Sequence, residues 1–501
     1  MKIKQTFITN FPADLFGSSK LKKQEMILRR RQKILNSTLR GLAVLFERWI
    51  SIEFLHSISL DSRKRAFPQV VVFWAWMAQI LQFNASCSKA VSLVQSWRLE
   101  AGLGSISSST AFFCAARSKL PLSFIKEVWS KVITSSKSEI RARHLWCGME
   151  VFSVDGSSVQ LMDTIANQNK YPQPAGQKKG CGFPVMKVLG ILNHSSGLWE
   201  DYCVAHPNEH DAKTMSRHLT NMPTEGLLMA DRAFCSYEII HRLRQQGMES
   251  VMRLHQMRAK GFTLRLGKRI GKFERLVTWK KPKSKPAHCE LSDEEWSTLD
   301  QEMEMRVIVC NYVDRNGECK RMILATTLLD NVKFDWLEIV NLYANRWDIE
   351  VRLRDVKTTM QMEELRVQTP EMAEKCLAMA LLAYNLVRSV CQESANQVEV
   401  EPKLMSYKET LDWINSSSHQ FSLVKANRGR YSSLRENFIT IASSKQINYR
   451  PYRWEPRLLK KRPKPFGLLK HARKDYHAAH QLGDDKVGDY VWNEANENLL
   501  N

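Results

Sequence analysis

Acidic residues are scarce in this chain, and so are the features that mark membrane-spanning or secreted proteins. Its 501 residues hold 52 Asp and Glu against 74 Lys and Arg. The most apolar run, Val70 to Ala78, is far shorter than the roughly 20 residues that a membrane-spanning helix needs. The first residues show no apolar segment followed by a small-residue cleavage site, which a secretory signal requires. These absences predict a cytoplasmic protein with no membrane partner.

Cysteine is present, but not in a pattern that would cross-link the chain. The eleven cysteines are an odd number, they are scattered from Cys87 to Cys391, and no two of them form a C-x-x-C pair. A disulfide framework or a zinc finger would need paired or closely spaced cysteines. The pattern therefore predicts reduced thiols without metal.

The formal net charge of +22 predicts a polyanionic partner, either nucleic acid or an anionic membrane surface. Twelve Lys and Arg fall within residues 252–285, where Glu274 is the one acid, and ten more fall within residues 450–474. Binding to a membrane surface needs an amphipathic basic helix, and residues 20–44 come closest to one. The two basic concentrations instead carry prolines and β-like pieces, which favours nucleic acid.

Hydrophobic periodicity divides the chain into parts of different character. Residues 1–140 carry apolar side chains at helical spacing. Near residue 145 alternating and β-branched runs begin, and up to residue 255 they predict three strands, a helix, a strand, a helix and a strand. This order is typical of a mixed α/β layer. Short β-like pieces follow over the basic stretch, and helical spacing returns after Asp335.

The most informative stretch is LYANRWDIEVRLRDVK, which begins at Leu342. On a regular helix five of its polar side chains would fall within roughly 80° of one another: Tyr343, Arg346, Glu350, Arg354 and Lys357. Glu350 would then stand in a row of cations beside an apolar face. Ordinary i,i+4 ion pairs are the structural alternative to a functional role for this carboxylate.

Two further carboxylates follow apolar strands. Asp155 comes after the run VFSV, and Asp231 ends the wholly apolar run GLLMA. A charge that closes a buried strand is costly unless it is paired or metal-bound. Together with Glu350, these residues would form an all-oxygen site suited to Mg²⁺ or Mn²⁺. Two such ions would promote in-line attack on a phosphodiester.

Four residues of the predicted helix match the spacing Tyr-(2)-Arg-(3)-Glu-(6)-Lys: Tyr343, Arg346, Glu350 and Lys357. In this signature the chain resembles the insertion sequence four family of bacterial DDE transposases. The passages VDGSSVQLMDTIANQNKYPQP around Asp155 and LLMADRAFCSY around Asp231 are similar to the same family. The resemblance runs from about residue 70 to about residue 390.

The resemblance implies an α/β fold with a ribonuclease H-like mixed sheet and flanking helices, interrupted by a β-rich insertion. A helical N-terminal domain and a basic C-terminal region would complete it. The chain would then divide into a DNA-end-binding region, the first part of the core, the basic insertion, the second part of the core, and a region for DNA contact or oligomerisation: residues 1–140, 141–255, 256–332, 333–395 and 396–501.

The resemblance also implies the activity and the site. The protein would bind the inverted-repeat ends of an insertion sequence, cleave the DNA and transfer the strands into target DNA, as a homodimer or higher synaptic assembly on double-stranded DNA. Asp155, Asp231 and Glu350 would be the catalytic ligands of two Mg²⁺ or Mn²⁺ ions. The cationic and Tyr residues of the signature would hold end-DNA phosphates, with Arg354 as a further candidate on their face. A catalytically inactive, DNA-binding inhibitor of transposition is the alternative.

Other residues could be mistaken for site residues or have two interpretations. Trp279, in the basic insertion, is a candidate to stack on an extruded base if a DNA hairpin forms, and a core tryptophan is the alternative. Asp163, Asp201 and Asp211 lie in polar or turn-like contexts, where we expect solvated carboxylates.

Overall fold

A computed structural model describes residues 39–60, 66–255, 267–313, 318–422, 428–447, 469–476, 486–487 and 490–491. All eleven cysteines lie in these ranges and are free, as their scatter predicts. No helix in the described ranges combines the length and the apolar character needed to cross a membrane. The α/β class is confirmed, because a large mixed sheet is combined with many helices.

Five strands form one side of the sheet, in the order β3-β2-β1-β4-β5, with β3 at the edge. Their bounds are Val151–Leu161 for β1, Val185–Asn193 for β2, Trp199–Ala205 for β3, Gly226–Ala230 for β4 and Met248–Arg253 for β5. β1 pairs antiparallel with β2 and parallel with β4, and β4 pairs parallel with β5. Helices α9 (Asp211–His218) and α10 (Tyr237–Gln245) stand before and after β4, as predicted. The sequence did not predict the short helix α8 (Ile165–Lys170) between β1 and β2.

Both faces of this part of the sheet are covered, which explains why β4 is apolar throughout. Phe152 and Val154 of β1 pack with α9 and α10 in one core. Val151 of β1 and Met229 of β4 pack against α13 (Trp336–Ala344) in a second core on the opposite face. The alternation of side chains along β1 therefore places one apolar set on each side.

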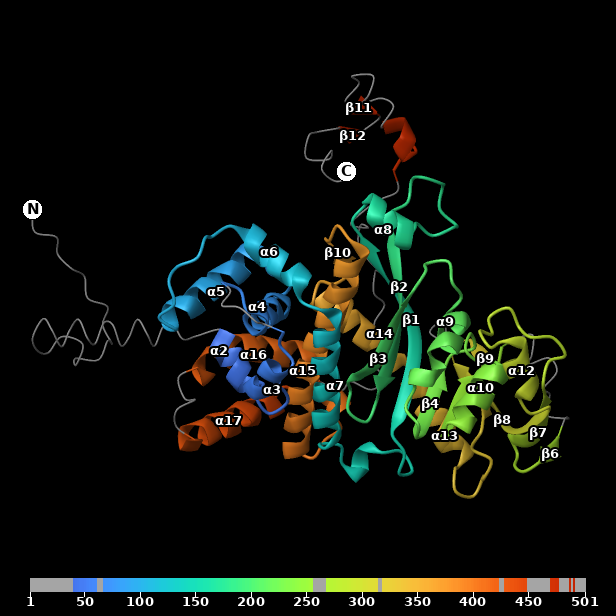
Figure 1. Ribbon diagram of the computed structural model, residues 1–501. Coiled ribbons are helices and arrows are strands. Elements are labelled where there is room, and N and C mark those ends of the chain that lie inside the picture. The colour runs from blue at the N-terminus through green and yellow to red at the C-terminus, as the bar shows by residue number, and fades with distance from the viewer. Residues whose placement is uncertain are drawn as a thin grey trace, which may run out of the picture.

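The basic insertion extends the core sheet instead of forming a separate one. Its elements are β6 (Lys268–Arg269), β7 (Glu274–Lys280), α12 (Asp293–Thr298), β8 (Glu302–Val313) and β9 (Cys319–Thr326). β9 pairs with β5, and the order β9-β8-β7-β6 continues the sheet in antiparallel pairs. These strands form the edge farthest from the N-terminal helices (Figure 1). Residues 256–266 and 314–317 of the expected insertion lie outside the described residues.

Helices from both ends of the chain share one large apolar core with residues of β1, β2 and β3. They are α2 (Leu39–Leu45), α3 (Ile52–Ser57), α4 (Gln69–Leu81), α5 (Cys87–Glu100), α6 (Thr110–Lys119), α7 (Leu122–Lys137), α15 (Pro370–Gln397), α16 (Tyr407–Phe421) and α17 (Arg428–Ser443). The long helix α15 runs beside α7 between the sheet and the remaining helices (Figure 1). The apolar run noted in the sequence is α4, which is buried almost all round.

The remaining short elements are η2 (Ala142–His144), α8 (Ile165–Lys170), η3 (Leu219–Asn221), β10 (Glu364–Leu365), η6 (Pro402–Leu404), β11 (Lys486–Val487) and β12 (Tyr490–Val491). Residues 1–38 and 448–468 lie outside the described residues, so most of the C-terminal basic concentration does too. Its end is described: Arg473 pairs with Asp163 at 2.5 Å and donates to the carbonyl of Gly180 at 2.9 Å. The segment 469–476 is thereby held against the core.

Candidate active site

Asp155 and Asp231 are neighbours because their strands are neighbours. β1 and β4 are parallel, with Val154 as the register partner of Ala230. Each aspartate is the next residue of its chain, so Asp155 lies within β1 and Asp231 directly after β4. Both carboxylates therefore arise at the same level of the sheet.

The segment that carries the signature residues is helical but irregular. In chain order it consists of α13 (Trp336–Ala344), the 3₁₀ turn η4 (Asn345–Trp347), α14 (Asp348–Arg354) and the π-helical turn η5 (Asp355–Thr359). The expectation of one regular helix with five polar side chains on a narrow face is wrong, because a 3₁₀ turn is tighter and a π turn wider than an α turn. The signature residues accordingly separate into two groups.

Arg346 joins the strand carboxylate to the helix carboxylate. Its Nη1 lies 3.8 Å from Asp155 Oδ2, and its Nη2 donates to Glu350 Oε1 at 3.3 Å. The Arg346 side chain is buried, whereas Glu350 is exposed at the surface of α14. The guanidinium also lies over the ring of Trp347, 5.2 Å from its centroid. Residues from β1 and α14, almost two hundred positions apart, thus meet through one side chain.

Tyr343 connects the same helical segment to the end of β4. Its hydroxyl donates to the carbonyl of Ala230 at 3.2 Å, next to Asp231. Burial raises the pKa of Tyr343 above its ordinary value of 10, so the phenol keeps its proton at neutral pH. Tyr343 is therefore a hydrogen-bond donor that holds α13 against the strand.

The electrostatics of the site centre on Asp155. The pKa of this carboxyl is raised from its ordinary 3.8 to about 6, chiefly by burial and to a smaller extent by the carboxylates of Asp231 and Glu350. The backbone N–H of Gly156, which donates to Asp155 Oδ1 at 2.8 Å, and the guanidinium of Arg346 oppose this rise. Asp155 is thus near enough to both other acids to be repelled by them, and Arg346 is the cation between Asp155 and Glu350.

The other residues expected to contact DNA lie in different surroundings. Lys357 lines a cavity of about 440 Å³ with Glu363 and Arg366, and burial lowers its pKa. Arg354 is exposed on α14. Trp279 lies in β7 and is 8% exposed, which favours the interpretation as a core tryptophan.

The three acids that we expected to be solvated are paired instead. Asp163 pairs with Arg473, and Asp201 accepts a hydrogen bond from His218 at 2.8 Å. Asp211 is the one that sequence analysis underestimated. It pairs with Lys187 at 2.7 Å, and a Cβ on Gly156 would stand 2.7 Å from its Oδ1.

Asp211 therefore lies against the residue that follows Asp155, and the pair Asp211–Lys187 borders the site. The signal in the sequence was Gly156 itself. A glycine next to a functional carboxylate indicates that another group approaches the backbone closely.

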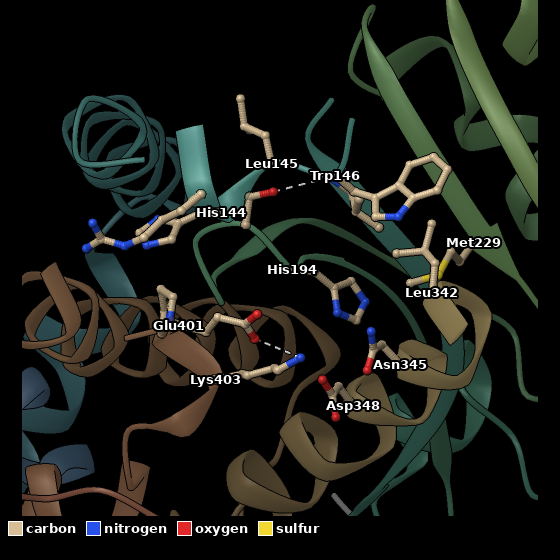
Figure 2. A pocket seen from close by; sticks show the side chains of 14 residues that line it. His144, Leu145, Trp146, His194, Met229, Leu342, Asn345, Asp348, Glu401 and Lys403 are labelled. Atoms are coloured by element: carbon tan, nitrogen blue, oxygen red, sulfur yellow. Dashed lines mark hydrogen bonds and ion pairs between the residues drawn. The ribbon is translucent and has the colours of Figure 1, made fainter. Parts of the chain in front are cut away.

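The far side of the signature segment faces a separate cavity of about 150 Å³ (Figure 2). Asn345 and Asp348 line it from η4 and α14, together with His194 and Lys403. This cavity does not include the three carboxylates of the candidate site. Glu350 and Asp348 thus lie on opposite sides of α14.

Asp155, Asp231 and Glu350 do not form a preassembled metal-binding cluster in the described structure. Within the described ranges, no three or more His, Cys, Asp or Glu side chains are gathered closely enough to hold one. The guanidinium of Arg346, which contacts both Asp155 and Glu350, accounts for part of this spacing.

Comparisons with known proteins bear on the family of this chain. Residues 146–386 match the family described as a transposase DDE domain, a range that contains all three acids. The transposase InsG for insertion sequence element IS4, from Escherichia coli K12, is 24% identical over 406 residues, which is 80% of this chain and 87% of InsG. The protein InsZ of the same strain, whose description also names a transposase, is 20% identical over 211 residues, 41% of this chain and 69% of InsZ.

One solved structure is a cryo-EM structure of a piggyBac transposase synaptic complex with hairpin DNA. It shares 11% identity and a TM-score of 0.40, over 81% of this chain and 85% of that chain. Because the TM-score is below 0.5, we base the description of the fold on the sheet topology and not on this similarity. The domain match and the long alignment to InsG, together with the complete signature, support a DDE transposase of the insertion sequence four (IS4) family.

Proposed function

We propose that this DNA transposase binds the inverted-repeat ends of an insertion sequence, cleaves phosphodiester bonds there and transfers the freed strands into target DNA. The observation that carries the proposal is that Asp155 and Glu350 share the guanidinium of Arg346, while Asp231 stands close enough to raise the pKa of Asp155. An acid on the first strand, a second after the fourth strand and a third on a later helix is the arrangement that the family resemblance implies for a ribonuclease H-like core.

The three acids are the proposed ligands of two Mg²⁺ or Mn²⁺ ions. Carboxylate oxygens are the donors that these hard cations prefer. The raised pKa of Asp155 also supports cation binding, because part of the rise comes from Asp231 and Glu350, and a divalent cation would relieve that repulsion. When bound, the ions would supply an activated water or 3′-hydroxyl and stabilise the leaving oxygen.

Arg346 has a double role in this proposal. Without DNA it neutralises Asp155 and Glu350. A DNA phosphate offers a guanidinium the same two-oxygen geometry as a carboxylate does. We infer that a phosphate of the element end draws Arg346 away from Glu350, so that Glu350 becomes free to join the two aspartates.

Tyr343 would fix the position of Arg346 on the helix, and Lys357 would hold a phosphate farther along the strand as a point charge. We further propose that the basic insertion follows the backbone of double-stranded DNA. Lys268, Arg269 and Lys272 are exposed on its described part. Two DNA ends must be brought together for transposition, so we expect a homodimer or a higher assembly.

The decisive experiment is cleavage of a supercoiled plasmid that carries the element's ends, with purified protein and Mg²⁺. We expect nicked and linear products from the wild type and none with EDTA. Glu350→Ala should still bind a labelled end fragment but should not cut it. Glu350→Ala cleavage at the wild-type rate would refute the site assignment.

The same assay separates the transposase from an inactive inhibitor that occupies the ends. Such an inhibitor would bind the ends as an active transposase does, but it would produce no cleavage in Mg²⁺ or Mn²⁺. The result would then be identical for the wild type and for Asp155→Ala.

A further inference from the structure

The helical segment that carries Glu350 and Lys357 widens between these two residues. In η5 the N–H of Met360 donates to the carbonyl of Asp355 at 3.0 Å, and the N–H of Met362 donates to that of Lys357 at 2.9 Å. Both bonds span five residues, which defines a π turn. One extra residue in a turn rotates the rest of the helix by up to about 100°, the angle of one α-helical residue. Lys357 is the third residue of η5, so the direction of its side chain relative to Glu350 depends on the course of this π turn.

Asp355, the first residue of the π turn, is held from outside the helix. Its Oδ2 accepts from Nη2 of Arg388 on α15 at 3.2 Å, and it lies 3.7 Å from Nη1 of Arg352. Arg352 is itself buried and donates to the carbonyl of Lys403 at 3.4 Å. Lys403 is the residue of η6 that is visible beside the segment in Figure 2.

Arg388 is fixed on every side. It is 1% exposed, its Nε donates to the Tyr384 hydroxyl at 2.9 Å, and its Nη1 donates to the carbonyl of Met405 at 3.2 Å. The guanidinium also lies over two rings, 5.5 Å from the centroid of Tyr384 and 5.1 Å from that of Tyr407. A buried guanidinium with this many partners cannot shift without leaving a charge unpaired.

Both ends of the π turn are fixed by the helical core. At its start, two guanidinium groups, those of Arg352 and Arg388, share the one carboxylate of Asp355. At its end, Met360 is fully buried, and its sulfur accepts from the Tyr407 hydroxyl at 2.9 Å. The wider turn allows the chain to satisfy both contacts, so loss of the pairing at Asp355 would release one of its two ends.

We propose that Arg388 is a positioning residue for DNA cleavage: through Asp355 it holds the π turn that directs Lys357 relative to Glu350. This inference rests on the proposed function of Glu350 and Lys357. It assigns Arg388 no contact with DNA, since the side chain is buried in the helical core.

The test compares Arg388→Lys with a matched control, Arg306→Lys. Arg306 is also fully buried and paired with an acid, Glu274, but it lies in β8 of the insertion. In both variants a lysine ammonium group replaces the planar guanidinium and loses some of its hydrogen bonds, so both should have a lower unfolding temperature. For each we would measure the unfolding temperature, the affinity for a labelled end fragment and the single-turnover cleavage rate per folded molecule.

We expect Arg388→Lys to lower the cleavage rate by about tenfold to a hundredfold with nearly unchanged end affinity, since small misplacements cost this much. Arg306→Lys should cleave at the wild-type rate per folded molecule. Equal cleavage rates for the two variants would overturn the inference.

A double-mutant cycle with Lys357→Ala tests the route of the effect. If Arg388 acts by directing Lys357, then Arg388→Lys should have little further effect in the Lys357→Ala background. Additive losses would instead show a general structural role. Should Arg388→Lys not fold, Asp355→Asn keeps the shape of the side chain and completes the same cycle.

The two proposals fail differently. A wild type that binds the ends without cutting them would overturn the proposed function and this inference with it. A wild type that cuts, together with additive losses in the cycle, would overturn the inference alone.

Discussion

Replacing Asp155 by Asn should stabilise the protein and abolish cleavage. The carboxyl is mostly buried beside two other acids, so its ionisation opposes folding at neutral pH. The amide of Asn has nearly the same shape and can still accept the hydrogen bond from the Gly156 N–H. It carries no charge and is a poor ligand for Mg²⁺.

The magnitude follows from the pKa of Asp155. The carboxyl titrates at about 6 in the folded protein against an ordinary 3.8, a gap of 6 − 3.8 = 2.2. At about 1.4 kcal/mol for each pH unit, this corresponds to about 3 kcal/mol of folding free energy. Because 22% of the side chain is exposed, solvent screening makes this value an upper bound.

The direction of the stability change caused by Asp155→Asn can be checked by varying the pH. Below pH 3.8 the carboxyl is protonated in both the folded and the unfolded chain, so the Asn variant gains nothing. As the pH rises toward 6, the unfolded chain ionises first, and the wild type loses stability relative to the variant. The advantage of Asp155→Asn should therefore be small near pH 4 and complete above pH 6.

The assay is denaturant unfolding in EDTA at pH 4.5 and 7.5, followed by addition of Mg²⁺. Mg²⁺ should raise the stability of the wild type and not that of Asp155→Asn, because a ligand stabilises only the state that binds it. Asp163→Asn is the matched control: it loses an ion pair with Arg473 and should not be stabilised. If the Asp155→Asn variant were less stable than the wild type at pH 7.5, the reasoning would be refuted.

The described contacts support three further predictions. Tyr343→Phe removes the hydrogen bond to Ala230 and should cost about 1 kcal/mol of folding free energy, measured by unfolding, with cleavage reduced because Arg346 is less firmly placed. Trp279→Ala should cost about 3 kcal/mol or more as a core truncation; an unchanged unfolding temperature with lost cleavage would favour base stacking instead. Charge reversal at the exposed Lys268 and Lys280 should weaken binding to any DNA sequence and reduce the slope of log affinity against log salt by about 1 for each lost phosphate contact; an unchanged slope would exclude this face as the DNA track.

The strand half of the site could be predicted from the sequence because the signal is local. An apolar run such as GLLMA must be a buried strand, and the acid that closes it must lie at the sheet edge. The pairing of β1 with β4 then brings Asp155 and Asp231 to one level. The run and its closing acid single out each aspartate, whereas their proximity comes from the strand pairing.

The helix half could be predicted only in part, because its shape depends on contacts distant in the chain. Residue spacing assumes a regular helix, and it places Lys357 beside Glu350. The π turn depends on the pairing of Asp355 with Arg388, thirty-three residues later, and no local pattern indicates that pairing. Trp279 shows the same limit, because its burial depends on the insertion joining the core sheet.

The position of β1 has a mechanical consequence. It is hydrogen-bonded along most of its length to β2 on one side and along its first residues to β4 on the other. Asp155 is therefore part of a strand that is paired on both sides, whereas Glu350 is exposed on a short helix bounded by two irregular turns. In the proposed mechanism, the adjustment that completes the site on DNA would therefore come from the helix, with the aspartates as the fixed reference and Glu350 as the residue that moves.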